Sequence, residues 1–288
     1  MPRLRFISLV LVGVAGIGLA ASPAIGVVKA RGSFRLDSAT VYANSTLFDG
    51  SAIETGNVSS ELQLAGGARL LLSSGSGGKV YRDRLVLEKG AVQLRAAGNY
   101  PIEARSLRVL PAGPDSTAQV VLDKAGRVQV AALNGPVQVT SAQGIVVANV
   151  LPGSALELSP QVAAAPSRLT GCLQQKNGRF LLTDETTNVT VELQGPGLDK
   201  EVGNVVEITG AMIPGAKPVA GATQVIQVSE LKSTGRKCSA PPAVPPPVAA
   251  GLSAGAKGAI IGGVIATATV VGMAAGGVFT EEKRPLSP

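Results

Sequence analysis

The stretch GRVQVAALNGPVQV, residues 126–139, contains one short pattern twice. In each copy a glycine precedes apolar, polar and apolar residues in turn, and this alternation sends successive side chains to opposite faces of a β-strand. The dipeptide Asn134-Gly135 separates the copies and favours a tight hairpin turn. A third copy, GAVQL, occupies residues 90–94. The pattern predicts stacked β units, but its irregular spacing does not establish a strict solenoid, and chance recurrence in a valine-rich chain remains the alternative.

The same organisation extends across residues 32–159, where short apolar runs alternate with turn residues and no stretch sustains a helical period. Glycines that supply the positive φ of tight turns separate the runs. We therefore expect an all-β domain: a sandwich, a roll or a short solenoid. The expected strands lie at 62–64, 70–72, 85–87, 92–94, 120–122, 128–130, 137–139 and 145–147. The expected turns lie at Asp49-Gly50, Gly66-Gly67, Gly75 to Gly78, Lys89-Gly90, Asn134-Gly135 and Gln143-Gly144.

Four segments within this region carry a family resemblance. They are DGSAIETG (49–56), ELQLAGGARL (61–70), LEKGAVQL (87–94) and NGPVQV (134–139), the last leading to Gly144 and to LPGSAL at 151–156. Over residues 28–160 the chain resembles the FecR-like periplasmic domain.

In the founding members of that family, the domain lies outside the inner membrane. It relays an outer-membrane receptor signal through one membrane helix to a cytoplasmic segment that controls a sigma factor. Here only residues 1–5 precede the first apolar run, so we do not expect sigma-factor control. The architecture is more similar to the domain used alone as an envelope module, as in acidobacteria-type proteins.

A second unit is expected over residues 168–238. Strand patterns at 179–183, 189–193, 205–210 and 223–228 are separated by glycines, and residues 198–202 suit a short helix or turn. So many short strands in so short a segment predict a small closed barrel. Residues 202–210, VGNVVEITG, resemble a strand of the OB-like barrels of bacterial envelope proteins. Such barrels bind oligonucleotides by stacking bases on aromatic side chains, and Phe180 is the single aromatic residue in this unit.

Cys172 and Cys238 flank this second unit and are the two cysteines of the chain. In an oxidising compartment such a pair most simply forms a disulfide, and closing so long a loop stabilises the fold by about 4 kcal/mol in the chain-entropy model. Free thiols and intermolecular pairing are the alternatives. Two cysteines without any histidine cannot complete a tetrahedral metal site, so we expect no bound metal.

The N-terminal segment has the layout of a secretory signal peptide, which we place at residues 1–24. Arg3 and Arg5 precede an apolar run at 6–21, and small residues follow at Ala20, Ala21 and Ala24. An uncleaved N-terminal anchor is the alternative. Either interpretation predicts that the body of the protein is exported.

A second apolar segment, residues 257–279, is long enough to cross a bilayer as a helix, and we expect a transmembrane helix there. Gly258 with Gly262, and Gly272 with Gly276, have the G-x-x-x-G spacing that lets membrane helices pack closely. This spacing leaves self-association as an open prediction. The alternative is a Gly/Ala-rich tail that never inserts. Basic residues in the short tail at 280–288 favour a cytoplasmic end for the chain.

Residues 239–256 form a Pro/Ala-rich linker between the second unit and the apolar segment. The run PPAVPPP at 241–247 favours an extended polyproline conformation, which spans roughly 20 Å. We expect a semi-rigid stalk; a disordered linker is the alternative. Both place the two units in the periplasm or on the outer surface.

The charges exclude several classes of function. The formal net charge is +7, of which Arg3 and Arg5 supply two, and basic residues such as Arg69, Lys79 and Arg105 are scattered singly. No basic block with interleaved aromatics is present, so we expect no nucleic-acid partner. The scattered charges suit a solvated surface, with mild attraction to anionic envelope polymers as the alternative. The chain has no histidine and no paired catalytic carboxylates that we could identify, so we expect neither an enzyme nor a cofactor.

Together these features predict a non-enzymatic envelope protein, tethered to a membrane, that binds another envelope protein or relays a signal. A structural component of the cell surface is the second hypothesis. An enzyme acting on envelope polysaccharide is the third, and it would require two carboxylates about 5 to 10 Å apart in a cleft.

Overall fold

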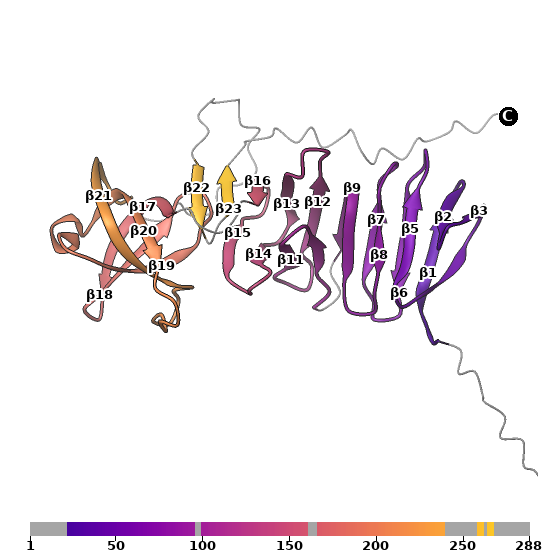
Figure 1. Cartoon of the computed structure of the whole chain (residues 1–288), viewed down its shortest axis with the longest axis horizontal. Helices are drawn as coiled ribbons and strands as arrows, with labels where there is room; N and C mark the ends of the chain where they lie inside the picture. Colours follow the sequence, from indigo (N-terminus) through magenta and orange to yellow (C-terminus); the bar gives the residue numbers. More distant parts are fainter. Residues whose placement is uncertain (1–21, 96–98, 161–165, 240–257, 262–263, 268–288) are drawn as a thin grey trace, which may run out of the picture.

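The computed structural model describes residues 22–95, 99–160, 166–239, 258–261 and 264–267. Within these ranges the chain is all-β, and the one helical element is the short 3-10 turn η1 (Leu198–Glu201). Figure 1 shows the strands following one another along the long axis of the molecule, from β1, β2 and β3 at one end to β17–β21 at the other. The predicted all-β class is confirmed.

Two units are named here by their strands. The first unit contains β1 (Ala24–Ala30), β2 (Phe34–Leu36), β3 (Ala39–Val41), β4 (Ser45–Phe48), β5 (Ser51–Thr55), β6 (Ser60–Leu64), β7 (Arg69–Leu72), β8 (Gly77–Val80), β9 (Leu85–Arg95), β10 (Ile102–Ala104), β11 (Leu107–Pro111), β12 (Thr117–Leu122), β13 (Val128–Asn134), β14 (Val137–Ser141), β15 (Val146–Val150) and β16 (Ala155–Pro160). The second contains β17 (Ser167–Lys176), β18 (Arg179–Asp184), β19 (Thr190–Gln194), β20 (Asn204–Met212) and β21 (Val225–Lys237), and β22 (Gly258–Ile261) and β23 (Val264–Thr267) follow.

The first unit is built from two sheets. Sheet 1 has the order β4-β1-β6-β7-β9-β12-β13-β16, with every neighbouring pair antiparallel. Sheet 2 has the order β3-β2-β5-β8-β9-β10-β11-β14-β15, in which only β9 and β10 run parallel. The chain moves back and forth between the sheets as it advances along the axis, so that residues near in sequence remain near in space.

Alternating side chains fill the space between the two sheets. In β6 the buried residues are Ser60, Leu62 and Leu64, while Glu61 and Gln63 are exposed. The same period of two in the other strands places one face of each sheet in the core and the other in solvent. Fully buried leucines, isoleucines and valines such as Leu70, Ile102 and Val130 make up that core.

Strand β9 belongs to both sheets, which the sequence did not predict. Its first half pairs with β8 in sheet 2, and its second half, from Gly90, pairs with β7 and β12 in sheet 1. Gly90 has φ +80°, which an L-residue rarely adopts, and a Cβ there would lie 2.6 Å from Ser76 Cα. Ser76 Oγ bonds both the amide and the carbonyl of Ala91 at 2.9 Å. Gly90 therefore lets β9 pass from sheet 2 to sheet 1, which we call the crossing, and the hydrogen bonds of Ser76 fix the strand at that point.

The five strands of the second unit pair in a closed ring. β17 pairs with β18 and with β20, β18 with β19, and β20 with β21, all antiparallel. The parallel pair β19–β21 completes the ring. The short element η1 lies between β19 and β20, within the segment expected to form a short helix or turn.

The C-terminal segment differs from its prediction. Residues 258–261 and 264–267 are not part of a helix: they form β22 and β23, which pair with each other. β23 also pairs with β16, and Arg168 of β17 pairs with Ile260 of β22, so the segment joins the open edges of the two units. Isoleucine, valine and threonine favour strands, and the edge of β16 offers unpaired backbone groups that another strand can satisfy.

The remaining terminal predictions fall largely outside the described residues. Among the residues that the structure covers, no helix is long and apolar enough to span a membrane. The signal peptide predicted at 1–24 overlaps the described chain only at residues 22–24, of which Ala24 opens β1. The linker at 239–256 is described at Ser239 alone, and the tail at 280–288 lies wholly outside.

Candidate functional site

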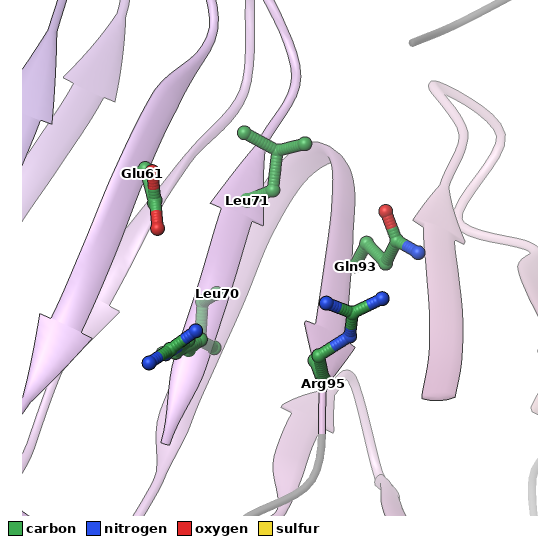
Figure 2. Close-up of a pocket in the computed structure, with 6 residues that line it drawn as sticks. Glu61, Leu70, Leu71, Gln93 and Arg95 are labelled. Atoms are coloured by element: carbon green, nitrogen blue, oxygen red, sulfur yellow. The ribbon is translucent and has the colours of Figure 1, made fainter. Parts of the chain in front are cut away.

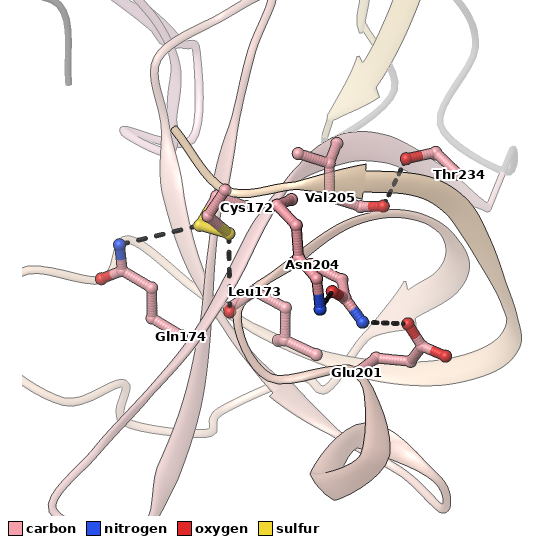
Figure 3. Close-up of a disulfide and its surroundings, with 9 residues drawn as sticks. Cys172, Leu173, Gln174, Glu201, Asn204, Val205 and Thr234 are labelled. Atoms are coloured by element: carbon pink, nitrogen blue, oxygen red, sulfur yellow. Dashed lines mark hydrogen bonds between the residues drawn. A yellow bond between two sulfur atoms is a disulfide. The ribbon is translucent and has the colours of Figure 1, made fainter. Parts of the chain in front are cut away.

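The predicted disulfide between Cys172 and Cys238 is present. Cys172 lies in the middle of β17, Cys238 directly follows β21, and their Cα atoms are 5.3 Å apart. The Cys238 amide donates to the Gly203 carbonyl at 2.9 Å, so the backbone at Cys238 is held by a hydrogen bond as well as by the disulfide. Figure 3 shows the bridge beside Leu173 and Gln174. The disulfide therefore fixes the last strand of the second unit at the point where the predicted stalk begins.

A hollow of about 640 Å³ lies next to this disulfide. Two of its charged residues pair with each other, since Arg236 Nη2 lies 3.0 Å from Glu185 Oε2, and Lys237 Nζ donates to Asn204 Oδ1 at 2.9 Å. Asp184 is buried, and this burial raises the pKa of its carboxyl. Its two oxygens accept bonds from the amides of Thr170, Thr186 and Thr187 at 2.8 to 3.0 Å. These contacts organise the turn after β18, so the hollow offers few charges to a ligand.

The two units meet at Asn149 of β15. Its amide donates to the Thr187 carbonyl at 2.7 Å, and its Nδ2 donates to the Asn188 carbonyl at 3.1 Å. Asn188 Nδ2 returns a bond to the Asn149 carbonyl at 3.3 Å. These bonds attach the turn at the end of β18 to the first unit.

The free end of the first unit exposes two aromatic side chains. Tyr42, which follows β3, is 79% exposed, and Phe48 at the end of β4 is 44% exposed. β3 and β4 are the terminal strands of sheets 2 and 1, and each has a single strand partner among the described residues. Unpaired strand edges and exposed aromatic residues are typical features of surfaces that bind other proteins. No sequence pattern distinguishes Tyr42 and Phe48, because only the fold shows that they lie at a free edge.

A second surface lies on the outer face of sheet 1. This face has a hollow of about 260 Å³, which we call the arginine hollow; it is lined by Glu61, Arg69, Leu70, Leu71, Gln93 and Arg95. Figure 2 shows Glu61, Leu71 and Gln93 on three neighbouring strands, with Arg95 two residues beyond Gln93. Arg69 of β7 and Arg95 of β9 are direct partners in the strand register. The sequence had indicated only scattered surface charges, because residues 26 positions apart become neighbours through strand pairing alone.

The glycines proposed for helix packing are not brought together in the described part of the chain. Gly258 opens strand β22, while Gly262, Gly272 and Gly276 lie outside the described residues. Packing through these glycines stays a prediction. Within the described ranges, no three acidic or cysteine side chains form a group that could hold a metal ion.

Comparisons with known proteins add little. No protein family matches the chain, and no curated protein matches it. Among solved structures, a candidate anti-sigma factor from Parabacteroides distasonis is similar at 17% identity with a TM-score of 0.30. The match covers 37% of this chain and 53% of that one, so it spans about half the length of that protein. A likeness of this strength supports no conclusion about the fold or the function.

Proposed function

We propose that the chain is an exported, non-enzymatic envelope protein, associated with a membrane, whose first unit is a FecR-like module that binds another envelope protein. The Cys172–Cys238 disulfide supports export, because structural disulfides persist in oxidising compartments. The segments that resemble the FecR-like domain fall on strands β5 to β16 of the two-sheet unit. We further propose that the second unit is an OB-like barrel, since five strands, a parallel β19–β21 pair and a turn before β20 suit that Greek-key fold.

The exposed edge at β3 and β4 is the observation that favours protein binding over a purely structural role. Tyr42 and Phe48 expose large apolar surface beside backbone groups that another strand could pair with. Aromatic side chains contribute most of the binding energy in many interfaces. A partner that docks there would reach the protein at the end remote from the second unit (Figure 1).

Site-specific crosslinking in intact cells tests this function. A photo-crosslinking residue placed at Tyr42 or Phe48 should capture a second envelope protein. The same residue at Met212, a 40% exposed apolar position in the second unit, provides the matched control. Capture of the chain by itself alone would favour the scaffold hypothesis, and capture of cytoplasmic proteins would contradict export.

Substitution of the exposed aromatic gives the quantitative form of the prediction. We expect Tyr42→Ala to weaken partner binding by about tenfold or more, since buried interface tyrosines are frequent hot spots. Its melting temperature should stay within about 1 °C of the wild type, because the side chain makes little contact within the fold. Unchanged affinity for the captured partner would exclude this edge as the binding surface.

A further inference from the structure

The opposed pair Arg69 and Arg95 is unfavourable for the fold by itself. Like charges directly opposite each other on neighbouring strands repel and destabilise the sheet. Both side chains are exposed, and neither forms an ion pair among the described residues. Some other arginines of the first unit are paired: Arg108 lies 2.7 Å from Glu103, and Arg127 lies 2.7 Å from Asp123. A bound anion would relieve the repulsion at the arginine hollow.

Most of the other side chains near the arginine pair are polar and not basic; the exceptions are the apolar Leu71 and Lys29 of β1, the register partner of Glu61. Gln63 is the register partner of Arg69, and Gln119 is the register partner of Gln93. Glu61 and Leu71 lie opposite each other between these residues. An amide both donates and accepts hydrogen bonds, and an ionised carboxylate only accepts them. The face therefore suits a ligand that carries an acidic group together with many hydroxyl groups.

Other anionic partners fit less well. A nucleic acid fits poorly, because the hollow has no aromatic residue on which bases could stack. Lipid surfaces are recognised by clusters of about four to eight basic residues beside the membrane, whereas this hollow has two. The guanidinium group of an arginine binds a carboxylate through two parallel hydrogen bonds. A second guanidinium group beside it strengthens the attraction for the carboxylate.

We propose that the arginine hollow binds the carboxylate groups of an acidic polysaccharide, with Arg69 and Arg95 contacting the acid and the glutamines and Glu61 contacting sugar hydroxyls. The polymer would lie across β6, β7, β9 and β12. This inference adds a second partner class to the proposed envelope module and rests on its export. The protein partner expected at Tyr42 is a separate site, so either proposal can fail without the other.

Binding of the purified full-length chain to polygalacturonate, measured by calorimetry at 0.15 M salt, tests the proposal. Neutral dextran of similar length and phosphatidylglycerol vesicles are the comparison ligands. We expect binding to polygalacturonate and no measurable binding to dextran. Absence of polygalacturonate binding would overturn the proposal, and so would tighter binding to the vesicles, which would identify a lipid surface instead.

Two double variants separate the site from net charge. Arg69→Gln with Arg95→Gln should weaken polygalacturonate binding by about tenfold or more, because each removes a charge-assisted hydrogen-bond donor. Arg82→Gln with Arg105→Gln removes the same charge from exposed turns of sheet 2 and should change binding less than about twofold. Equal losses in both variants would show non-specific attraction and contradict a site.

A charge reversal tests whether the arginine pair exists for binding rather than for stability. Arg95→Glu places a carboxylate opposite Arg69, so the repulsion becomes attraction. We expect the melting temperature to rise by about 1–3 °C while binding of polygalacturonate is lost. A fall in melting temperature would show that the arginine pair stabilises the fold, and retained binding would exclude Arg95 from the site.

Discussion

Replacing Cys172 and Cys238 with serine is expected to lower the free energy of unfolding of the second unit by about 4 kcal/mol. The bridge closes a loop with a sequence separation of 66, which includes all of β18, β19 and β20. Without the bridge the unfolded chain gains conformational entropy, which makes unfolding more favourable. Loss of the bridge also releases the end of β21, whose last residues are mostly exposed. Urea denaturation followed by far-ultraviolet circular dichroism measures the loss.

The tyrosines provide an internal control for this experiment. The chain has no tryptophan, and its three tyrosines, at positions 42, 81 and 100, all lie in the first unit. Tyrosine fluorescence therefore reports unfolding of the first unit alone. We expect that transition to move by less than about 1 kcal/mol in the cysteine variant. A far-ultraviolet transition that also stays in place would show that the second unit does not depend on its bridge.

Gly90→Ala is expected to destabilise the first unit by about 3 kcal/mol. Two costs combine: φ is +80° at this residue, and the new Cβ would lie 2.6 Å from Ser76 Cα. Ser76 cannot move away easily, because its Oγ bonds the backbone of Ala91 and its amide donates to Thr55 Oγ1 at 2.8 Å. Urea denaturation followed by tyrosine fluorescence measures the change.

Gly144→Ala provides the matched control for the crossing. Gly144 has φ +79°, almost the same as Gly90, but a Cβ there would meet no atom within 4 Å. It should therefore show only the cost of the left-handed backbone, about 1 kcal/mol. Equal losses at Gly90 and Gly144 would mean that contact with Ser76 adds nothing and that the crossing does not depend on glycine packing.

Local features of the fold were predictable from the sequence because they depend on neighbouring residues. Of the turn glycines expected from short motifs, Gly50, Gly67, Gly75, Gly90, Gly135 and Gly144 have positive φ; Gly66, Gly77 and Gly78 do not, and Gly77 and Gly78 lie in β8. Alternation of apolar and polar residues located strands such as β6 and β13. The presence of only two cysteines predicted their disulfide, and the ring of strands brings the two residues together.

Features that depend on pairing between distant strands were not predictable. Leu85-Val-Leu87 and Val92-Gln-Leu94 were expected as separate strands, yet Gly90 bends one continuous strand from sheet 2 into sheet 1. The hydropathy of residues 257–279 predicts a membrane helix. Hydropathy does not reveal that the edge of β16 offers unpaired backbone groups with which β23 pairs. The arginine hollow likewise depends on the register of β7 and β9.

The redox state of Cys172 and Cys238 in living cells tests the central claim, that the two units occupy an oxidising exterior. Cells are quenched with acid, and the denatured protein is treated with a polyethylene glycol maleimide before and after reduction. We expect no gel shift before reduction and a shift by two labels after it. Two labels added before reduction would show free thiols and contradict export of the protein.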